Sequence, residues 1–139
     1  MSNAAGGVQA KPDSTLTRQA ARDLSSYQYH AMKQTNQTFD YADSSSGDMV
    51  MGVLQNNPDT TGKEAEIATG GTTLLYVDAN SPNIAVGDHL GSNSNFHGVQ
   101  VTGDDAFYFA IAMEAATADG DIIEAKLVGP SYISGSGDD

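Results

Sequence analysis

The sequence predicts an all-β protein, with a small β-barrel or sandwich as its body and an extended N-terminal arm. From residue 36 onward, short runs of β-branched and aromatic residues alternate with polar ones, which is the period of a half-buried strand. Clusters of Gly, Asn, Asp and Pro separate these runs and favour turns. The length of 139 residues suits one domain. We therefore expect an arm over residues 1–35, a β-rich domain over 36–130 and a C-terminal tail over 131–139.

Residues 1–35 form the predicted arm. Its first fifteen residues are rich in Gly, Ala, Ser and Pro and hold almost no large apolar side chains, which is typical of a segment without its own core. Leu16, Ala20 and Leu24 share a helical spacing, so a short helix is an alternative here. A helix this short and polar is not stable alone. We therefore expect the arm to be flexible until a partner surface orders it.

The body is predicted to consist of short strands joined by turns. Strands are expected over residues 38–41, 48–54, 64–68, 73–77, 88–90, 96–101, 106–114 and 121–128. Turns are expected at residues 56–59, 70–71, 80–83, 91–93 and 119–121. Ala and Met are common in residues 106–118, so a helix is the alternative there. We expect a strand because Phe107, Tyr108 and Phe109 open this run and a turn closes it.

The charge of the chain is strongly asymmetric. Six Lys and Arg face 18 Asp and Glu, for a formal net charge of -12. Residues 1–35 hold four cations and two acids, a net of +2, and residues 36–139 hold two cations and sixteen acids, a net of -14. So acidic a body argues against nucleic acid as a partner, because phosphate binding needs a basic surface.

The sequence also lacks the apolar runs that are typical of a membrane span and of a secretory signal. No apolar run approaches the roughly 20 residues of a membrane span, so no membrane partner is expected. Residues 1–15 lack the apolar core of a secretory signal, and we expect an intracellular protein.

Motifs for catalysis are absent from the sequence. There is no Cys, which removes thiolate metal sites and cysteine nucleophiles. The patterns of the hydrolase nucleophile elbow, of the phosphate-binding glycine loops and of the HExxH metal helix do not occur. We therefore expect neither an enzyme nor a cofactor.

Two weaker metal hypotheses remain. His89 and His97 lie eight residues apart and could join Asp88 in a metal site, although this spacing is loose. Acidic pairs occur at Asp104-Asp105 and around Asp119-Gly120-Asp121, but without the EF-hand spacing. We expect surface histidines and a hairpin turn at 119–121 rather than a metal site.

The arm carries the residues that we predict to contact another chain. Amphipathic aromatic side chains in a polar segment are typical anchors at protein interfaces. The alternative is that they pack back onto the body of the same chain. The predicted contact residues are Arg18, Arg22, Leu24, Tyr27, Tyr29 and His30.

Several short motifs of the body resemble one viral family. They are Gly52-Val53, the acidic run 64–71 that ends in two glycines, Val86-Gly87-Asp88-His89-Leu90, and the run from Ala110 to Ile123 that contains Ala118-Asp119-Gly120. In this order they are similar to the small head-decoration, or capsid cement, proteins of tailed bacteriophages. The resemblance covers about residues 48–128.

The resemblance implies a structural protein without catalysis or cofactor. It implies a compact β domain on the outside of the virion capsid, often a homotrimer, with a terminal arm over neighbouring major capsid proteins. Assembly would take place in the cytoplasm of the host bacterium. Two other classes stay open: another phage component, such as a tail-tube or head–tail joining protein, and a small metal- or carbohydrate-binding β domain.

Overall fold

The fold is built almost entirely of β-strands. A computed structural model describes residues 10–103 and 106–132, and the prediction of an all-β fold is confirmed for this part of the chain. One short 3-10 helix, η2 (Ser44–Ser46), interrupts the strands. The strands are β1 (Pro12–Ala20), β2 (Ala31–Thr35), β3 (Thr38–Tyr41), β4 (Gly52–Leu54), β5 (Glu64–Asp78), β6 (His89–Ser92), β7 (Gly98–Gln100), β8 (Phe107–Ala112) and β9 (Asp119–Tyr132). Within the described residues no helix has the length and apolar character needed to cross a membrane.

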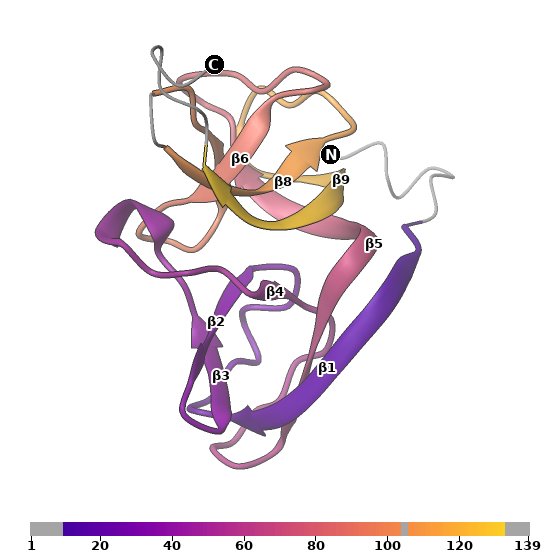
Figure 1. The fold of residues 1–139 in the computed structure, drawn as a ribbon, viewed down its shortest axis with the longest axis vertical. Coiled ribbons are helices and arrows are strands. Elements are labelled where there is room, and N and C mark those ends of the chain that lie inside the picture. The colour runs from indigo at the N-terminus through magenta and orange to yellow at the C-terminus, as the bar shows by residue number, and fades with distance from the viewer. Residues whose placement is uncertain (1–9, 104–105, 133–139) are drawn as a thin grey trace.

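The strand pairings close into two small barrels that share β5 (Figure 1). In the first barrel the order is β1-β3-β2-β4-β5, and β5 pairs back with β1. In the second barrel the order is β5-β7-β6-β8-β9, and β9 pairs back with β5. β5 can serve both because it is 15 residues long: its first half pairs with β1 and β4, and its second half with β9 and β7. Ring closure leaves few strand edges free.

Two glycines lie where β5 passes from one barrel to the other. The predicted turn at Gly70-Gly71 is wrong, because β5 continues through both glycines without interruption. This single strand contains both strands that were predicted over 64–68 and 73–77. Gly71 has a φ of 75°. A Cβ on Gly71 would collide with the Lys11 carbonyl oxygen, and Thr72 N–H donates to that same oxygen at 3.1 Å. Glycine is therefore needed for the close approach of β1 rather than for a turn.

Each barrel has its own hydrophobic core. Seven buried side chains fill the first barrel: Ala20, Leu24, Met32, Phe39, Leu54, Ala65 and Ile67. The larger core fills the second barrel with Leu75, Val77, Leu90, Phe109 and Ile123, and it extends into the first barrel at residues such as Ala31 in β2 and Val53 in β4. β5 supplies both cores, since alternate residues along it are buried.

The predicted boundary at residue 36 does not match the fold. β1 pairs with β5 from Pro12 to Gln19, and Leu24 and Met32 are fully buried. The alternative of a helix over Leu16–Leu24 is wrong as well, because the hydrogen bonds to β5 hold this stretch extended. β1 cannot be recognised from its own residues, because the strand that stabilises it, β5, lies about 50 residues away in the chain. Residues 1–9 of the predicted arm lie outside the described residues.

The C-terminal boundary moves too. Ser131 and Tyr132 belong to β9 and pair with Tyr108 and Phe107, so the strand extends into the predicted tail. Residues 133–139 lie outside the described residues.

The structure distinguishes between the strand and the helix that the sequence left open over residues 106–118. Residues 107–112 form β8, so the strand is confirmed and the helix is wrong. The predicted hairpin turn at 119–121 is wrong, because Asp119 and Asp121 pair with Asp78 and Val77 at the start of β9. Gly120, with a φ of 92°, sits at an irregularity in this pairing.

Candidate functional site

A cluster of aromatic and imidazole rings lies where the two barrels meet. We call it the aromatic seam, and its members are Tyr27, His30, Tyr41, Tyr76, Phe96 and His97. Tyr41 stacks on Phe96 with ring centroids 4.0 Å apart. His30 lies 4.8 Å from both Tyr76 and His97. Phe96 and His97 belong to the β6–β7 turn of the second barrel, so their rings pack against rings that come from the first barrel.

Backbone hydrogen bonds hold the two sides of the seam together. Ala31 N–H donates to the Phe96 carbonyl at 3.1 Å, and Tyr76 N–H donates to the Tyr29 carbonyl at 2.9 Å. Tyr29 and Phe96 both have a φ of 66°, a conformation that non-glycine residues seldom adopt. The seam thus fixes the backbone of two loops, which indicates a structural role.

An ion pair and a hydrogen bond close the two ends of the seam. Arg22 donates to both carboxylate oxygens of Asp40 at 2.8 and 2.9 Å and lies 4.7 Å from the centre of the Tyr41 ring. This hydrogen-bonded contact with Asp40 raises the pKa of Arg22. At the other end, His97 Nδ1 lies 2.8 Å from an oxygen of Asp119.

His30 is the one buried imidazole in the seam. Its Nδ1 donates to the Gln28 carbonyl at 3.1 Å. Burial lowers the pKa of His30, and the nearby His97 adds to the effect. The ring is therefore neutral near neutral pH and packs as an aromatic side chain rather than as a cation.

The residues predicted to contact another chain lie in the body of their own chain. Arg22, Tyr27 and His30 belong to the seam and its ion pair, and Tyr29 packs against the core of the second barrel. Leu24 is fully buried and His30 is 5% exposed, so the prediction of a contact role is wrong for these two residues. Arg18 reaches the surface, where its guanidinium donates to the Thr17 carbonyl at 2.9 Å.

The residues of the histidine metal hypothesis are not brought together. His89 packs on Tyr108, while His97 stands at the other end of the β6–β7 hairpin against His30 and Asp119. Asp88 accepts hydrogen bonds from the Ala85 N–H at 2.8 Å and from Gln100 at 3.0 Å. In residues 10–103 and 106–132 no group of three His, Asp or Glu side chains could hold a metal. Asp104 and Asp105 lie outside the described residues.

Three acidic residues of the family-like motifs accept hydrogen bonds from backbone N–H groups, two of them in turns and one in β9. Asp88 accepts from the backbone of the turn that starts β6, and Gly87 in this turn has a φ of 95°. Asp121 accepts from Thr117 and Ala118, both at 3.2 Å. Glu114 accepts from the Glu124 N–H at 2.8 Å. Each of these carboxylates gives a hydrogen-bond acceptor to one or two backbone N–H groups. This role explains their presence without acid–base chemistry.

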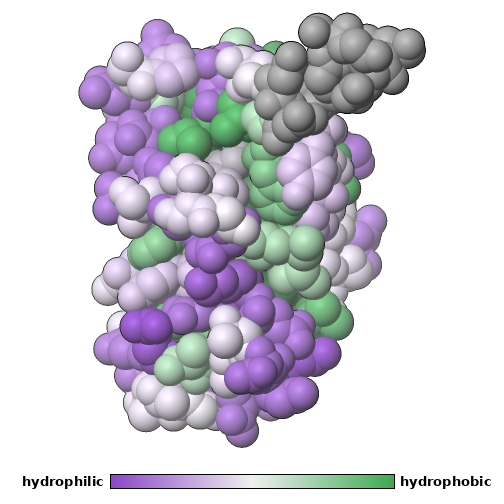
Figure 2. Space-filling view, turned by 60° about the vertical axis from the view of Figure 1, so that its left-hand side comes forward, coloured by the Kyte–Doolittle hydropathy of each residue, from purple (hydrophilic) through white to green (hydrophobic). Residues whose placement is uncertain are grey.

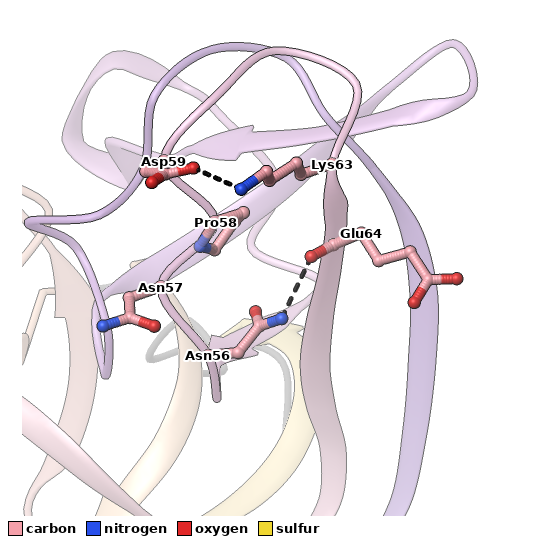
Figure 3. A pocket seen from close by; sticks show the side chains of 6 residues that line it. All are labelled: Asn56, Asn57, Pro58, Asp59, Lys63 and Glu64. Atoms are coloured by element: carbon pink, nitrogen blue, oxygen red, sulfur yellow. Dashed lines mark hydrogen bonds and ion pairs between the residues drawn. The ribbon is translucent and has the colours of Figure 1, made fainter.

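A polar depression of about 340 Å³ lies at the loop before β5 (Figure 3). Asn56 spans it, donating to the Glu64 carbonyl at 3.0 Å and accepting from the Glu66 N–H. Lys63 pairs with Asp59 at 2.8 Å. Three of the side chains that line this hollow, Asn56, Asp59 and Lys63, are engaged in hydrogen bonds or an ion pair within the loop and its junction with β5.

A second hollow is more apolar and lies beside η2. We call it the apolar groove; it is lined by Met49, Phe107 and Tyr132, with Ser44, Gly47 and Asp48. Its volume is about 150 Å³, and a wider hollow of about 370 Å³ over Val99, Val101 and Phe107 adjoins it. Figure 2 brings the side of η2 forward and shows apolar surface spread over the upper half of the molecule.

Sequence reasoning missed this groove. Its walls come from three segments around residues 44–49, 99–107 and 132, and only pairing of β8 with β9 places Phe107 5.1 Å from Tyr132.

In the comparison with known proteins, no protein-family model matches the chain, and no curated protein matches it.

Proposed function

We propose that this chain is a structural protein that decorates and stabilises the outer surface of a tailed-phage capsid, binding across major capsid protein subunits. One observation carries the proposal. Two of the motifs that resemble capsid cement proteins, residues 86–90 and 110–123, come together in β6, β8 and β9 of the second barrel. The other two, residues 52–53 and 64–71, pair with each other in β4 and the first half of β5. Because β5 continues into the second barrel, this one strand connects all four motifs.

Three further features support a structural role. Closed barrels give a small protein few free strand edges, which suits a protein displayed in many copies. The net charge of -12 would keep decorated particles apart and away from free nucleic acid. Three motif carboxylates, those of Asp88, Glu114 and Asp121, accept hydrogen bonds from the backbone of turns or of β9, which supports rigidity. The proposal includes no enzymatic activity and no cofactor, and it places the protein in the virion, where a trimer is expected.

The apolar groove is the proposed contact surface for the shell. Met49 is 54% exposed and Tyr132 is 66% exposed, so both can be buried by a partner. The neighbouring carboxylate of Asp48 is paired with Lys33 at 3.2 Å, which lessens the charge that a partner would have to desolvate. Many copies on one shell make weak individual contacts sufficient.

The test is binding of the purified protein to capsids that lack it. The double substitution Met49→Ser and Tyr132→Ser should weaken capsid binding by roughly 30- to 700-fold, since each side chain would bury apolar surface worth about 1–2 kcal/mol. The matched control is Val86→Ser, which removes an equally exposed apolar side chain, 68% accessible, at the turn before β6. Its binding should stay within about twofold of the original.

Two outcomes would count against the proposal. If the protein does not bind capsids, and if its loss leaves capsid stability unchanged, the function is wrong. Rings or tubes of the purified protein in the electron microscope would instead support a tail-tube or head–tail joining component. Equal weakening by Val86→Ser would keep the function but move the contact away from the groove.

A further inference from the structure

Within the described residues, β1 has an edge that is left unpaired over most of its length. β1 pairs with β5 from Pro12 to Gln19, but on its other side it meets β3 only at Gln19 and Ala20. Within the described residues no strand covers this second edge over residues 14–18. A strand edge with free backbone groups can pair with another strand.

The hydrogen bonds at the end of β1 establish which groups face the open edge. Ala20 N–H donates to Lys63 and its carbonyl accepts from Gly62, so Ala20 faces β5. Ala21 N–H donates to the Phe39 carbonyl and faces β3. Because backbone direction alternates along a strand, Leu16 and Arg18 face β5, while Thr15 and Thr17 turn their N–H and C=O groups to the open edge.

The side chains around this edge leave room for a partner. Residues 13–17 are exposed on both faces of β1, although alternate residues of a strand normally differ. Leu16 in the middle is a large apolar side chain with 37% exposure. β1 and Lys11 together carry Lys11, Arg18 and Asp13, a net of +1 in a chain of net charge -12. This is the part of the molecule where two copies would repel each other least.

We infer that β1 pairs with β1 of a second copy of this chain, antiparallel about a two-fold axis at Leu16. In this register Thr15 of one copy lies opposite Thr17 of the other, and each such pair exchanges two hydrogen bonds. Leu16 then faces Leu16 of the second copy in a non-hydrogen-bonded pair, where Cα atoms lie about 4.5 Å apart and side chains touch. The edge is thus complementary to itself, which is what a two-fold interface requires.

The ends of β1 set the length of this interface. β3 occupies the place beside Gln19, so pairing stops at Arg18, which lies opposite Ser14 of the second copy. The pairing of β1 with β5 is irregular at Pro12–Ser14, where the strand can bend away. Arg18 covers the Thr17 carbonyl in the single chain and must swing off it on pairing. A short interface of this kind gives a weak dimer, and it does not depend on the proposed function.

Single cysteines test the register, because the natural chain has none. Leu16→Cys should form a disulfide-linked dimer under mild oxidation, since the Cα distance of the facing pair suits a disulfide. Thr15→Cys, one residue away, should cross-link at least about tenfold more slowly, because its counterpart lies two residues along the strand and more than 7 Å away. Thr61→Cys, exposed in the loop before β5, measures random collision.

The results separate cleanly. Fast cross-linking of Leu16→Cys alone supports the inference. Cross-linking at the rate of Thr61→Cys overturns it, and so does a trimer in which Leu16→Cys stays unlinked. Faster linking of Thr15→Cys contradicts the register at Leu16.

Sedimentation of the cysteine-free protein gives an independent reading. Thr17→Pro removes an outward N–H and should weaken dimerisation at least about tenfold, while an edge position lets the single chain tolerate proline. Thr17→Ala keeps that N–H and should dimerise within about threefold of the original. Equal dimerisation of both variants would contradict the inference.

Discussion

Replacing Leu24 with alanine should lower the free energy of unfolding by about 2–5 kcal/mol. Leu24 is fully buried in the core of the first barrel with Met32, Phe39 and Ile67. Its removal would leave a cavity between strands that are tied to each other around a ring and cannot collapse freely. Denaturation by urea, followed by circular dichroism, measures the loss.

Leu16→Ala is the matched control for this prediction. The same side chain is removed from the same segment, but Leu16 is 37% exposed and lies outside the two cores. Its loss should cost less than about 1 kcal/mol. If Leu24→Ala were as mild as Leu16→Ala, residues 12–24 would be a separate arm and the first barrel would not be closed by β1.

Replacing Gly71 with alanine should destabilise the protein by about 2–4 kcal/mol. Two costs add at this position. The positive φ of 75° disfavours any side chain, and the new Cβ would strike the Lys11 carbonyl oxygen. Because that oxygen belongs to the backbone, β1 itself must shift away from β5. Thermal or urea unfolding measures the sum.

Gly62→Ala separates the two costs. Gly62 has a φ of 93° but open space around its Cβ position, so only the backbone cost of about 1–2 kcal/mol applies. Gly71→Ala should therefore exceed Gly62→Ala by at least about 1 kcal/mol. Equal losses would mean that β1 does not approach Gly71 closely.

Sequence patterns were informative where a strand is recognisable from its own residues. The runs 38–41, 73–77 and 106–114 have the composition of strands; the first forms β3, the second is part of β5, and the third contains β8. β1 was missed because nearly all of its side chains are polar or exposed and its pairing with β5 is a long-range contact. Glycine at 70–71 was misinterpreted for the same reason, since a turn and a close approach of another strand both favour it.

The candidate site was harder to predict than the fold. The tyrosines of residues 27 and 29 and His30 were recognised as unusual, but the sequence could not distinguish contact with another chain from packing on Phe96 and Tyr76. Those partners lie about 45–70 residues away in the chain. The apolar groove and the open edge of β1 depend on strand register, which no local pattern encodes.

Amide hydrogen exchange of the dilute protein, resolved residue by residue by NMR, tests the central claim most directly. If β1 closes the first barrel, the amides of Leu16 and Arg18, which face β5, should exchange at least about a hundredfold more slowly than those of Thr15 and Thr17. Leu24 and Met32 should be protected with the core. Exchange of every amide from residue 13 to residue 35 at the rate of an unfolded chain would contradict the account.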